Sequence, residues 1–169
     1  MNGLNNGRNT GPTRELSLAE QKSWQHYLAT VLHMTPWLNG TLAMTHQVSL
    51  ADVQLLDLLG TAPSGGIPMG KLAAALPSPP SRLTRQVRRL EADGLVQRMT
   101  SPHDHRRVLA TLTDAGRVVR DNAMITYATE VRTHFLGPLT RPQIAAMATT
   151  CHHLGEAAQR PDQSAGSVL

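Results

Sequence analysis

Residues 69–116 read MGKLAAALPSPPSRLTRQVRRLEADGLVQRMTSPHDHRRVLATLTDAG, and this stretch decides the fold. It predicts a short helix over residues 69–76, which ends at the proline-rich run 77–80 because proline lacks a backbone N–H donor. A second helix follows at once, with Ser78 as the expected N-cap and Pro79 in the first helical position.

The second helix is expected to have a buried face and a polar face. Leu83, Val87 and Leu90 recur at spacings of four and three and predict the buried stripe. Gly94 is expected to end this helix. The polar residues that lie elsewhere on its surface are Ser81, Arg82, Arg85, Arg88 and Arg89.

Two short β-prone runs come next, over residues 95–100 and 108–112. A polar loop over residues 101–107 joins them into a hairpin with a basic tip, and Ile67 could add a single short strand. A short helix, a tight turn, a second helix and a hairpin, in that order, predict a winged helix-turn-helix in which the hairpin is the wing.

The charge of the chain is concentrated in this segment. The 169 residues carry a net charge of +4, but residues 71–107 alone hold eight basic and three acidic residues, a net charge of +5, and the rest of the chain carries −1. Such an asymmetry points to a polyanionic partner. Aromatic residues are only 3% of the chain, which argues against proteins that stack bases on aromatic side chains.

A basic helix of this kind fits the major groove of DNA, where arginine can contact guanine in a bidentate manner. Arg106 and Arg107 at the wing tip are placed to reach the backbone or a minor groove. A solvated polar face would explain one such arginine. Four arginines on one helix, followed by a basic hairpin, favour DNA binding.

The residues of the wing carry a family resemblance. Residues 104–116 follow the pattern D-x-R-R-x4-L-T-x2-G, which closely resembles the wing signature of the MarR (multiple antibiotic resistance regulator) family. Residues 72–96 also resemble the recognition-helix segment of that family. The resemblance is strong over residues 50–116 and rests on architecture alone for the flanking helices.

The resemblance implies roles for individual residues. It implies that Arg106 enters the minor groove, and that Asp104 orients the wing through a charge-assisted bond to an arginine. It also implies contacts to bases or phosphates in the major groove from Ser81, Arg82, Thr84 and Arg85. Arg88 and Arg89 are expected to reach phosphate.

Capping signatures predict helix starts at Ser17–Glu20, Ser49–Asp52 and Thr140–Gln143. Pro36 interrupts the first helical pattern and is expected to kink or split that helix near Thr35.

The pattern divides the chain into five segments. They are a disordered N-terminal tail (1–15), a helical segment for dimerisation and a ligand cleft (16–48), the winged helix (49–113), C-terminal dimerisation helices (114–159) and a flexible tail (160–169).

The flanking helices are expected to form a homodimer. A long helix capped by Thr113 is apolar around much of its circumference, and the last helix has an apolar stripe that no later element covers. That stripe comprises Ile144, Met147, Ala148, Cys151, Leu154 and Ala158. The alternative is that these helices only close the core of the monomer. Cys151 is expected to be a small core residue rather than a redox sensor.

Five residues of the first helix could line a ligand pocket: Trp24, Tyr27, His33, Met34 and Trp37. The resemblance implies a small anionic aromatic effector there, and plain core packing is the alternative. The histidines lack the spacing of a chelating pair, so no metal site and no cofactor are expected.

These observations predict a mainly α fold with a small β-hairpin wing, a winged helix-turn-helix flanked by N- and C-terminal dimerisation helices. We expect a cytoplasmic transcription regulator, a ligand-responsive repressor that binds a pseudo-palindromic operator in double-stranded DNA as a homodimer. The alternatives are a winged-helix protein-interaction module and a nonspecific architectural DNA-binding protein. The chain lacks enzyme motifs and long apolar runs, so neither catalysis nor a membrane span is expected.

Overall fold

The computed structural model describes residues 15–62, 66–102, 104 and 106–159. Most of these residues are helical, and a small antiparallel sheet accompanies them. The fold class predicted from the sequence is therefore confirmed. The disorder predicted for the two tails falls, apart from Glu15, on residues outside this description.

The first helix, α1 (Leu18–His46), starts at the predicted capping box. The side chain of Ser17 accepts a hydrogen bond from the backbone N–H of Glu20, and the Glu20 carboxylate accepts one from the backbone N–H of Ser17. Of the two outcomes expected at Pro36, a kink or a split near Thr35, the split does not occur, because one helix runs through Pro36. Thr35 and Pro36 are both exposed. Burial of Leu38 and Leu42 holds the part that follows.

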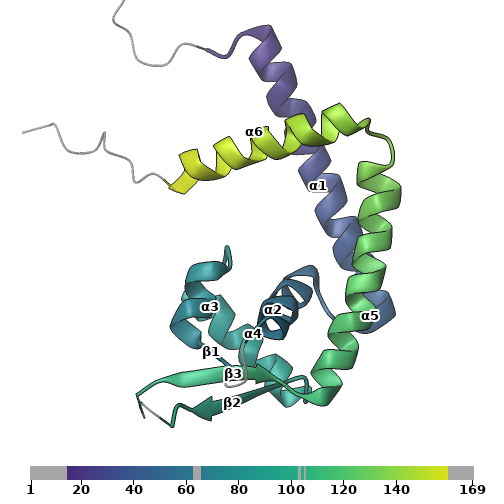
Figure 1. Ribbon diagram of the computed structural model, residues 1–169. Coiled ribbons are helices and arrows are strands. Elements are labelled where there is room, and N and C mark those ends of the chain that lie inside the picture. Colours follow the sequence, from purple (N-terminus) through teal and green to yellow (C-terminus); the bar gives the residue numbers. More distant parts are fainter. Residues whose placement is uncertain (1–14, 63–65, 103, 105, 160–169) are drawn as a thin grey trace, which may run out of the picture.

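The predicted winged helix-turn-helix is present. It comprises α2 (Leu50–Gly60), β1 (Ile67–Pro68), α3 (Met69–Ala75), α4 (Pro80–Ala92), β2 (Val96–Thr100) and β3 (Val108–Leu112). The strands form an antiparallel sheet in the order β1-β3-β2, with Ile67 opposite Ala110 and Val96 opposite Leu112. Figure 1 shows the helices of this unit packed above the wing.

The α4 helix buries the predicted stripe. Leu83, Val87 and Leu90 are each at most 1% exposed and pack in the same core as residues of α2, α3 and the sheet. Gly94 follows the helix with a φ of +73°, a left-handed conformation that glycine adopts without steric cost. This turn leads the chain directly into the wing.

The predicted start of α4 is wrong by one residue. Pro79, not Ser78, is the N-cap, and Pro80 takes the first helical position. The carbonyl of Pro79 accepts the backbone N–H groups of Arg82 and Leu83. Because both prolines lack an N–H, few donors remain for a capping side chain to satisfy.

A long helical segment follows the wing. It consists of α5 (Asp114–Glu130), which continues into a π-helical segment, η1 (Val131–Leu136), and is followed by α6 (Arg141–Gln159). Thr113 caps α5 as predicted, since its hydroxyl accepts the backbone N–H of Gly116 and donates to the carbonyl of Gly94. This pair of hydrogen bonds ties the start of α5 to the end of α4.

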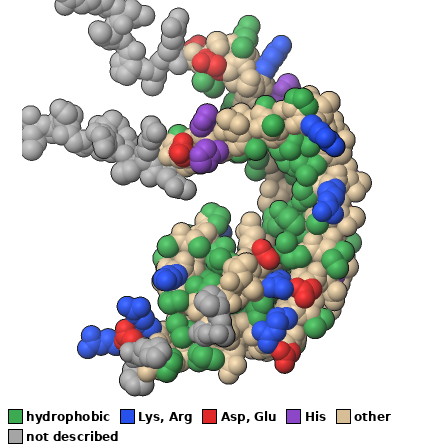
Figure 2. Space-filling model, viewed as in Figure 1, with side chains coloured by type: hydrophobic (Ala, Val, Ile, Leu, Met, Phe, Trp, Pro, Cys, Tyr) green, Lys and Arg blue, Asp and Glu red, His purple; other side chains and the backbone are tan. Residues whose placement is uncertain are grey.

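Much of α1 and α6 is exposed in the part of the protomer that the structure describes. Every side chain from residue 15 to 33 is exposed, as are Ala148, Cys151 and Leu154 on the predicted stripe of α6. Ile144 and Met147 are half-buried, and the side chain of Ala158 is outside the described part. Figure 2 shows hydrophobic side chains on the surface of these upper helices.

The expectation that Cys151 is a core residue is therefore wrong for the protomer, where its thiol side chain is exposed. Among the described helices, none is long and apolar enough to cross a membrane.

Gly116 provides a test of the packing at the base of the wing. A Cβ atom at this position would lie 1.9 Å from the carbonyl oxygen of Leu95. We expect Gly116→Ala to lower the free energy of unfolding by about 1–3 kcal/mol, because the backbone must shift to relieve the overlap. Urea unfolding at a fixed protein concentration would measure it.

The matched control is Gly70→Ala in α3, where a Cβ atom would meet nothing within 4 Å. We expect no loss of stability from this control. Equal stability of the two variants would contradict the packing described for Gly116.

Candidate nucleic-acid interface

The α4 helix presents four different faces to its surroundings. Opposite the buried stripe, Ser81, Arg85 and Arg88 are exposed on the outward face. One flank faces α2, and the other faces the wing. Each flank carries a polar side chain that is bonded to a neighbouring element, so both the packing of the stripe and these bonds set the orientation of α4.

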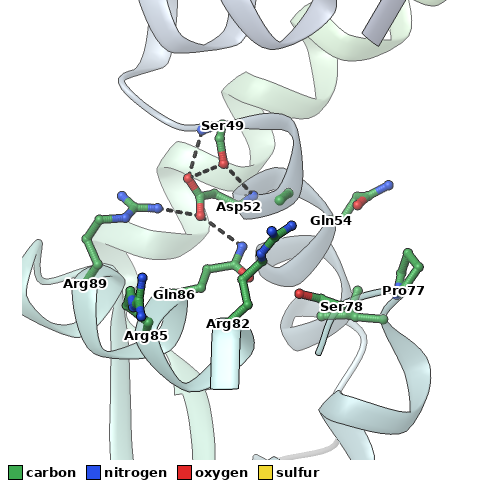
Figure 3. Close-up of a pocket in the computed structure, with 11 residues that line it drawn as sticks. Ser49, Asp52, Gln54, Pro77, Ser78, Arg82, Arg85, Gln86 and Arg89 are labelled. Carbon is green, nitrogen blue, oxygen red and sulfur yellow. Dashed lines mark hydrogen bonds and ion pairs between the residues drawn. The ribbon is translucent and has the colours of Figure 1, made fainter. Parts of the chain in front are cut away.

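Asp52 forms the bond on the α2 side (Figure 3). Its Oδ2 atom accepts hydrogen bonds from the backbone N–H of Ser49 (2.8 Å) and from the Ser49 hydroxyl (2.6 Å). Its Oδ1 atom accepts one from Nε2 of Gln86 (2.9 Å) and pairs with the guanidinium of Arg89 at 2.5 Å. Among the described residues, Asp52 is the only ionisable side chain that is buried.

The charge on Asp52 is stabilised by these partners. Burial by itself raises the pKa of a carboxyl group, because water no longer stabilises the charged form. At Asp52 the hydrogen bonds from Ser49 and Gln86, together with the positive charge of Arg89, outweigh burial and hold the pKa below its ordinary value. The side chain is thus a charged anchor at neutral pH.

Glu91 forms the bond on the wing side. Its Oε2 atom accepts hydrogen bonds from two guanidinium nitrogens of Arg98 at 2.7 and 2.6 Å, and Oε1 accepts the backbone N–H of Arg98 at 3.2 Å. The hydrogen bond from the Arg98 side chain is the main reason that the pKa of Glu91 is lowered. The pair ties α4 to β2 and neutralises one arginine of the basic segment.

The loop of the wing is organised by Asp104. Its carboxylate pairs with Nε of Arg107 at 2.9 Å and accepts the backbone N–H of Arg106 at 3.1 Å. The expected bond between Asp104 and an arginine is therefore present, and its partner is Arg107. The Arg106 side chain is exposed. Figure 2 shows basic side chains at the lower left of the molecule, where the wing ends.

Two cavities lie beside α4. The first has a volume of about 340 Å³ and is lined by the start of α2, the turn between α3 and α4, and the flank of α4 with Arg82, Gln86 and Arg89. Ser78 lines it too, and its hydroxyl is buried without a hydrogen-bond partner among the described residues. The second, of about 360 Å³, lies between α3, α4 and the wing and is lined by Thr84 and Arg98.

The residues expected to line a ligand pocket lie along α1, as the sequence places them. Trp24, Tyr27 and His33 are exposed, and Met34 is half-buried. Trp37 packs edge-on against His134 of η1, with 4.5 Å between the ring centroids. Neither cavity beside α4 includes any of them. Within the part of the chain that is described, no three potential metal-ligating side chains come together.

Sequence reasoning missed the two anchors. Asp52 was predicted only as the acid that starts α2, and Gln86 and Glu91 were not singled out. The spacing of Gln86 and Arg89 on one flank of α4 is a signal of a shared partner, but it does not identify α2 as the source of that partner.

Residues 46–107 match the profile of the MarR family. The chain is similar to the structure of Sco3205, a MarR family transcriptional regulator from Streptomyces coelicolor, in complex with DNA. The two are 27% identical, the match covers 90% of this chain and 96% of that one, and the TM-score is 0.85.

Two further structures are similar to the chain. AbsC, a MarR family transcriptional regulator from Streptomyces coelicolor, is 25% identical with a TM-score of 0.81, over 86% of this chain and 98% of that one. CouR from Rhodococcus jostii RHA1, bound to p-coumaroyl-CoA, shares the fold at 24% identity with a TM-score of 0.69, over 82% and 95%. No curated protein matches the chain.

Replacement of Asp52 tests the anchor between α2 and α4. We expect Asp52→Asn to lower the free energy of unfolding by about 1–3 kcal/mol at pH 7, because the amide cannot accept every hydrogen bond made to the buried carboxylate. The pKa of Asp52 is lowered in the folded state. Its contribution is therefore complete above the unfolded-state pKa of about 3.9, and is lost as the pH falls through the folded-state value.

Urea unfolding of both proteins between pH 7 and pH 3, at fixed protein concentration, would measure this difference. The matched control is Asp93→Asn, since Asp93 also pairs with Arg89 but is half-exposed. We expect the control to change stability by at most about 1 kcal/mol. If the difference in the free energy of unfolding between Asp52→Asn and the unaltered protein stayed constant down to pH 3, Asp52 would not be the charged anchor described above.

Proposed function

This chain carries a MarR-family winged-helix domain, and on that premise we propose that it is a DNA-binding transcription regulator that acts as a homodimer on a pseudo-palindromic operator. The observation that carries the proposal is the outward face of α4. Its arginines are exposed, while the acidic residues of the same segment are bonded to other arginines. The similarity to Sco3205, whose structure was solved with DNA, supports the same function.

In the proposed complex, α4 lies in the major groove. Ser81, Arg82, Thr84, Arg85 and Arg88 would contact bases and phosphates there, because arginine and hydroxyl side chains provide the donors that base edges and phosphates accept. Arg106 would enter the minor groove from the wing, and Arg107 would approach the backbone. These contacts imply an affinity that falls steeply with salt.

The homodimer would form through the exposed helices. The exposed apolar side chains of α1 and α6 include Leu28, Val31, Leu32 and Leu154. A second copy packed against them would create a two-fold assembly, with the two α4 helices about 34 Å apart for successive major grooves.

Regulation by a small ligand is part of the proposal. The residues Trp24, Tyr27, His33, Met34 and Trp37 lie on the helix that a second copy would cover, so a cleft there would form between the two subunits. A small anionic aromatic effector would weaken operator binding if it favoured a dimer with a different spacing of the two α4 helices. The similar fold of CouR, solved with p-coumaroyl-CoA, supports a ligand of this chemistry. The role would then be that of a cytoplasmic repressor without catalytic activity.

Fluorescence anisotropy tests the function. The probes are labelled DNA from upstream of the chain's own gene and a shuffled control, each across a salt series. A preference of about 10³ or more for the native DNA at physiological salt would establish a specific regulator. Equal binding to both would favour a nonspecific architectural protein, and binding to neither, even at low salt, would favour a protein-interaction module.

Arg106 tests the role of the wing. We expect Arg106→Ala to weaken binding to the native DNA by about 1–3 kcal/mol in free energy, because the minor-groove contact is lost, while the far-ultraviolet circular dichroism stays unchanged. The matched control is Arg141→Ala at the start of α6, an exposed arginine far from the wing along the chain. Normal binding by Arg106→Ala would show that the wing assignment is wrong.

A further inference from the structure

Arg89 differs from the other arginines of α4 in what it contacts. Its guanidinium pairs with Asp52 at 2.5 Å and with Asp93 at 3.2 Å. The side chains of Arg82, Arg85 and Arg88 make no hydrogen bond or ion pair with any described residue. Three of the four arginine charges of α4 are therefore available to a polyanion, and the fourth, that of Arg89, is paired with carboxylates.

The Asp52 carboxylate, which pairs with Arg89, is fixed in the interior and cannot move outward with the Arg89 side chain. Asp52 is 1% exposed and is fixed by Ser49 and Gln86, as Figure 3 shows. If Arg89 turned outward to a phosphate, a buried carboxylate would lose its only cationic partner among the described residues. The Arg89 side chain is half-exposed, but the Asp52 carboxylate is buried, and leaving a buried charge without its cationic partner is strongly unfavourable.

The same contacts fix how α4 is presented. Gln86 and Arg89 lie three residues apart on the flank of the helix that faces α2, and both end at Oδ1 of Asp52. Because the start of α2 holds the other carboxylate oxygen, α4 cannot rotate about its axis without breaking a buried hydrogen bond. The outward arginines are thereby held in one direction.

We propose, given the DNA-binding function above, that Asp52 is a positioning residue for DNA recognition, which holds Arg89 on α2 so that Arg89 makes no phosphate contact. The phosphate-facing charge of α4 is then carried by Arg82, Arg85 and Arg88. This assignment differs from the expectation from the sequence that Arg89 reaches phosphate.

The test is the slope of log K against log salt concentration for DNA binding, measured by anisotropy on the native and shuffled DNAs. Each phosphate contact contributes about 0.9 to the magnitude of this slope. The decisive variant is the double replacement Asp52→Asn with Arg89→Gln, which removes both charges of the pair together and leaves no unpaired buried carboxylate. We expect its slope to equal that of the unaltered protein. A slope reduced by about 0.9 would overturn the proposal, because it would show a lost phosphate contact.

The single variant Asp52→Asn is expected to make DNA binding more dependent on salt. The variant leaves Arg89 only its half-exposed pair with Asp93, which is weak enough for a phosphate to replace. We therefore expect the magnitude of the slope to increase by about 0.9 on both DNAs. A purely structural role for Asp52 would lower the active fraction of protein without increasing the slope, and an unchanged or smaller slope would overturn the proposal. Arg88→Gln serves as the reference variant for the loss of one exposed arginine.

The outcomes also separate this inference from the proposed function. If the unaltered protein binds neither DNA, the proposed function fails. If it binds with a salt-dependent affinity and the double variant loses about 0.9 of the slope, the proposed function stands and the role of Asp52 fails.

Discussion

The carboxylate of Asp52 is buried where α2 meets α4, and the geometry of the proposed DNA-reading surface depends on it. A buried charge is tolerated only when it is paired and hydrogen-bonded, so the surrounding groups have few alternative positions. Ser49 satisfies one oxygen from the start of α2, and Gln86 and Arg89 satisfy the other from α4. Core packing keeps α4 against the protein, and this network limits how the helix rotates and tilts there.

The acidic residues of the basic segment have a second consequence. Glu91 pairs with Arg98, Asp93 with Arg89 and Asp104 with Arg107, so each of the three neutralises an arginine nearby. This pairing does not alter the net charge of the segment, but it decides where on the surface the unpaired positive charges lie. The side chains of Arg85, Arg88 and Arg106 are left exposed. The positive charge is thereby directed to the outward face of α4 and to the tip of the wing.

Local sequence patterns predicted most of the elements. The stripe of Leu83, Val87 and Leu90, the capping boxes and the two β-prone runs all correspond to observed structure, because each depends on contacts within a few residues. The predictions that failed concern residues whose environment depends on contacts between elements that are distant in the sequence. Of the two outcomes expected at Pro36, α1 does not split, and Cys151, expected in the core, is exposed in the protomer.

The winged helix-turn-helix, its basic character and the candidate residues at its surface follow from the sequence alone, because helix periodicity, glycine and proline positions and charge are local properties. Which arginines pair with a carboxylate depends on the tertiary structure. Asp52 and Arg89 are far apart in the chain, and no periodicity links them. Their pairing follows from the packing of α2 against α4, which brings a buried charge within reach of the one flank that can neutralise it.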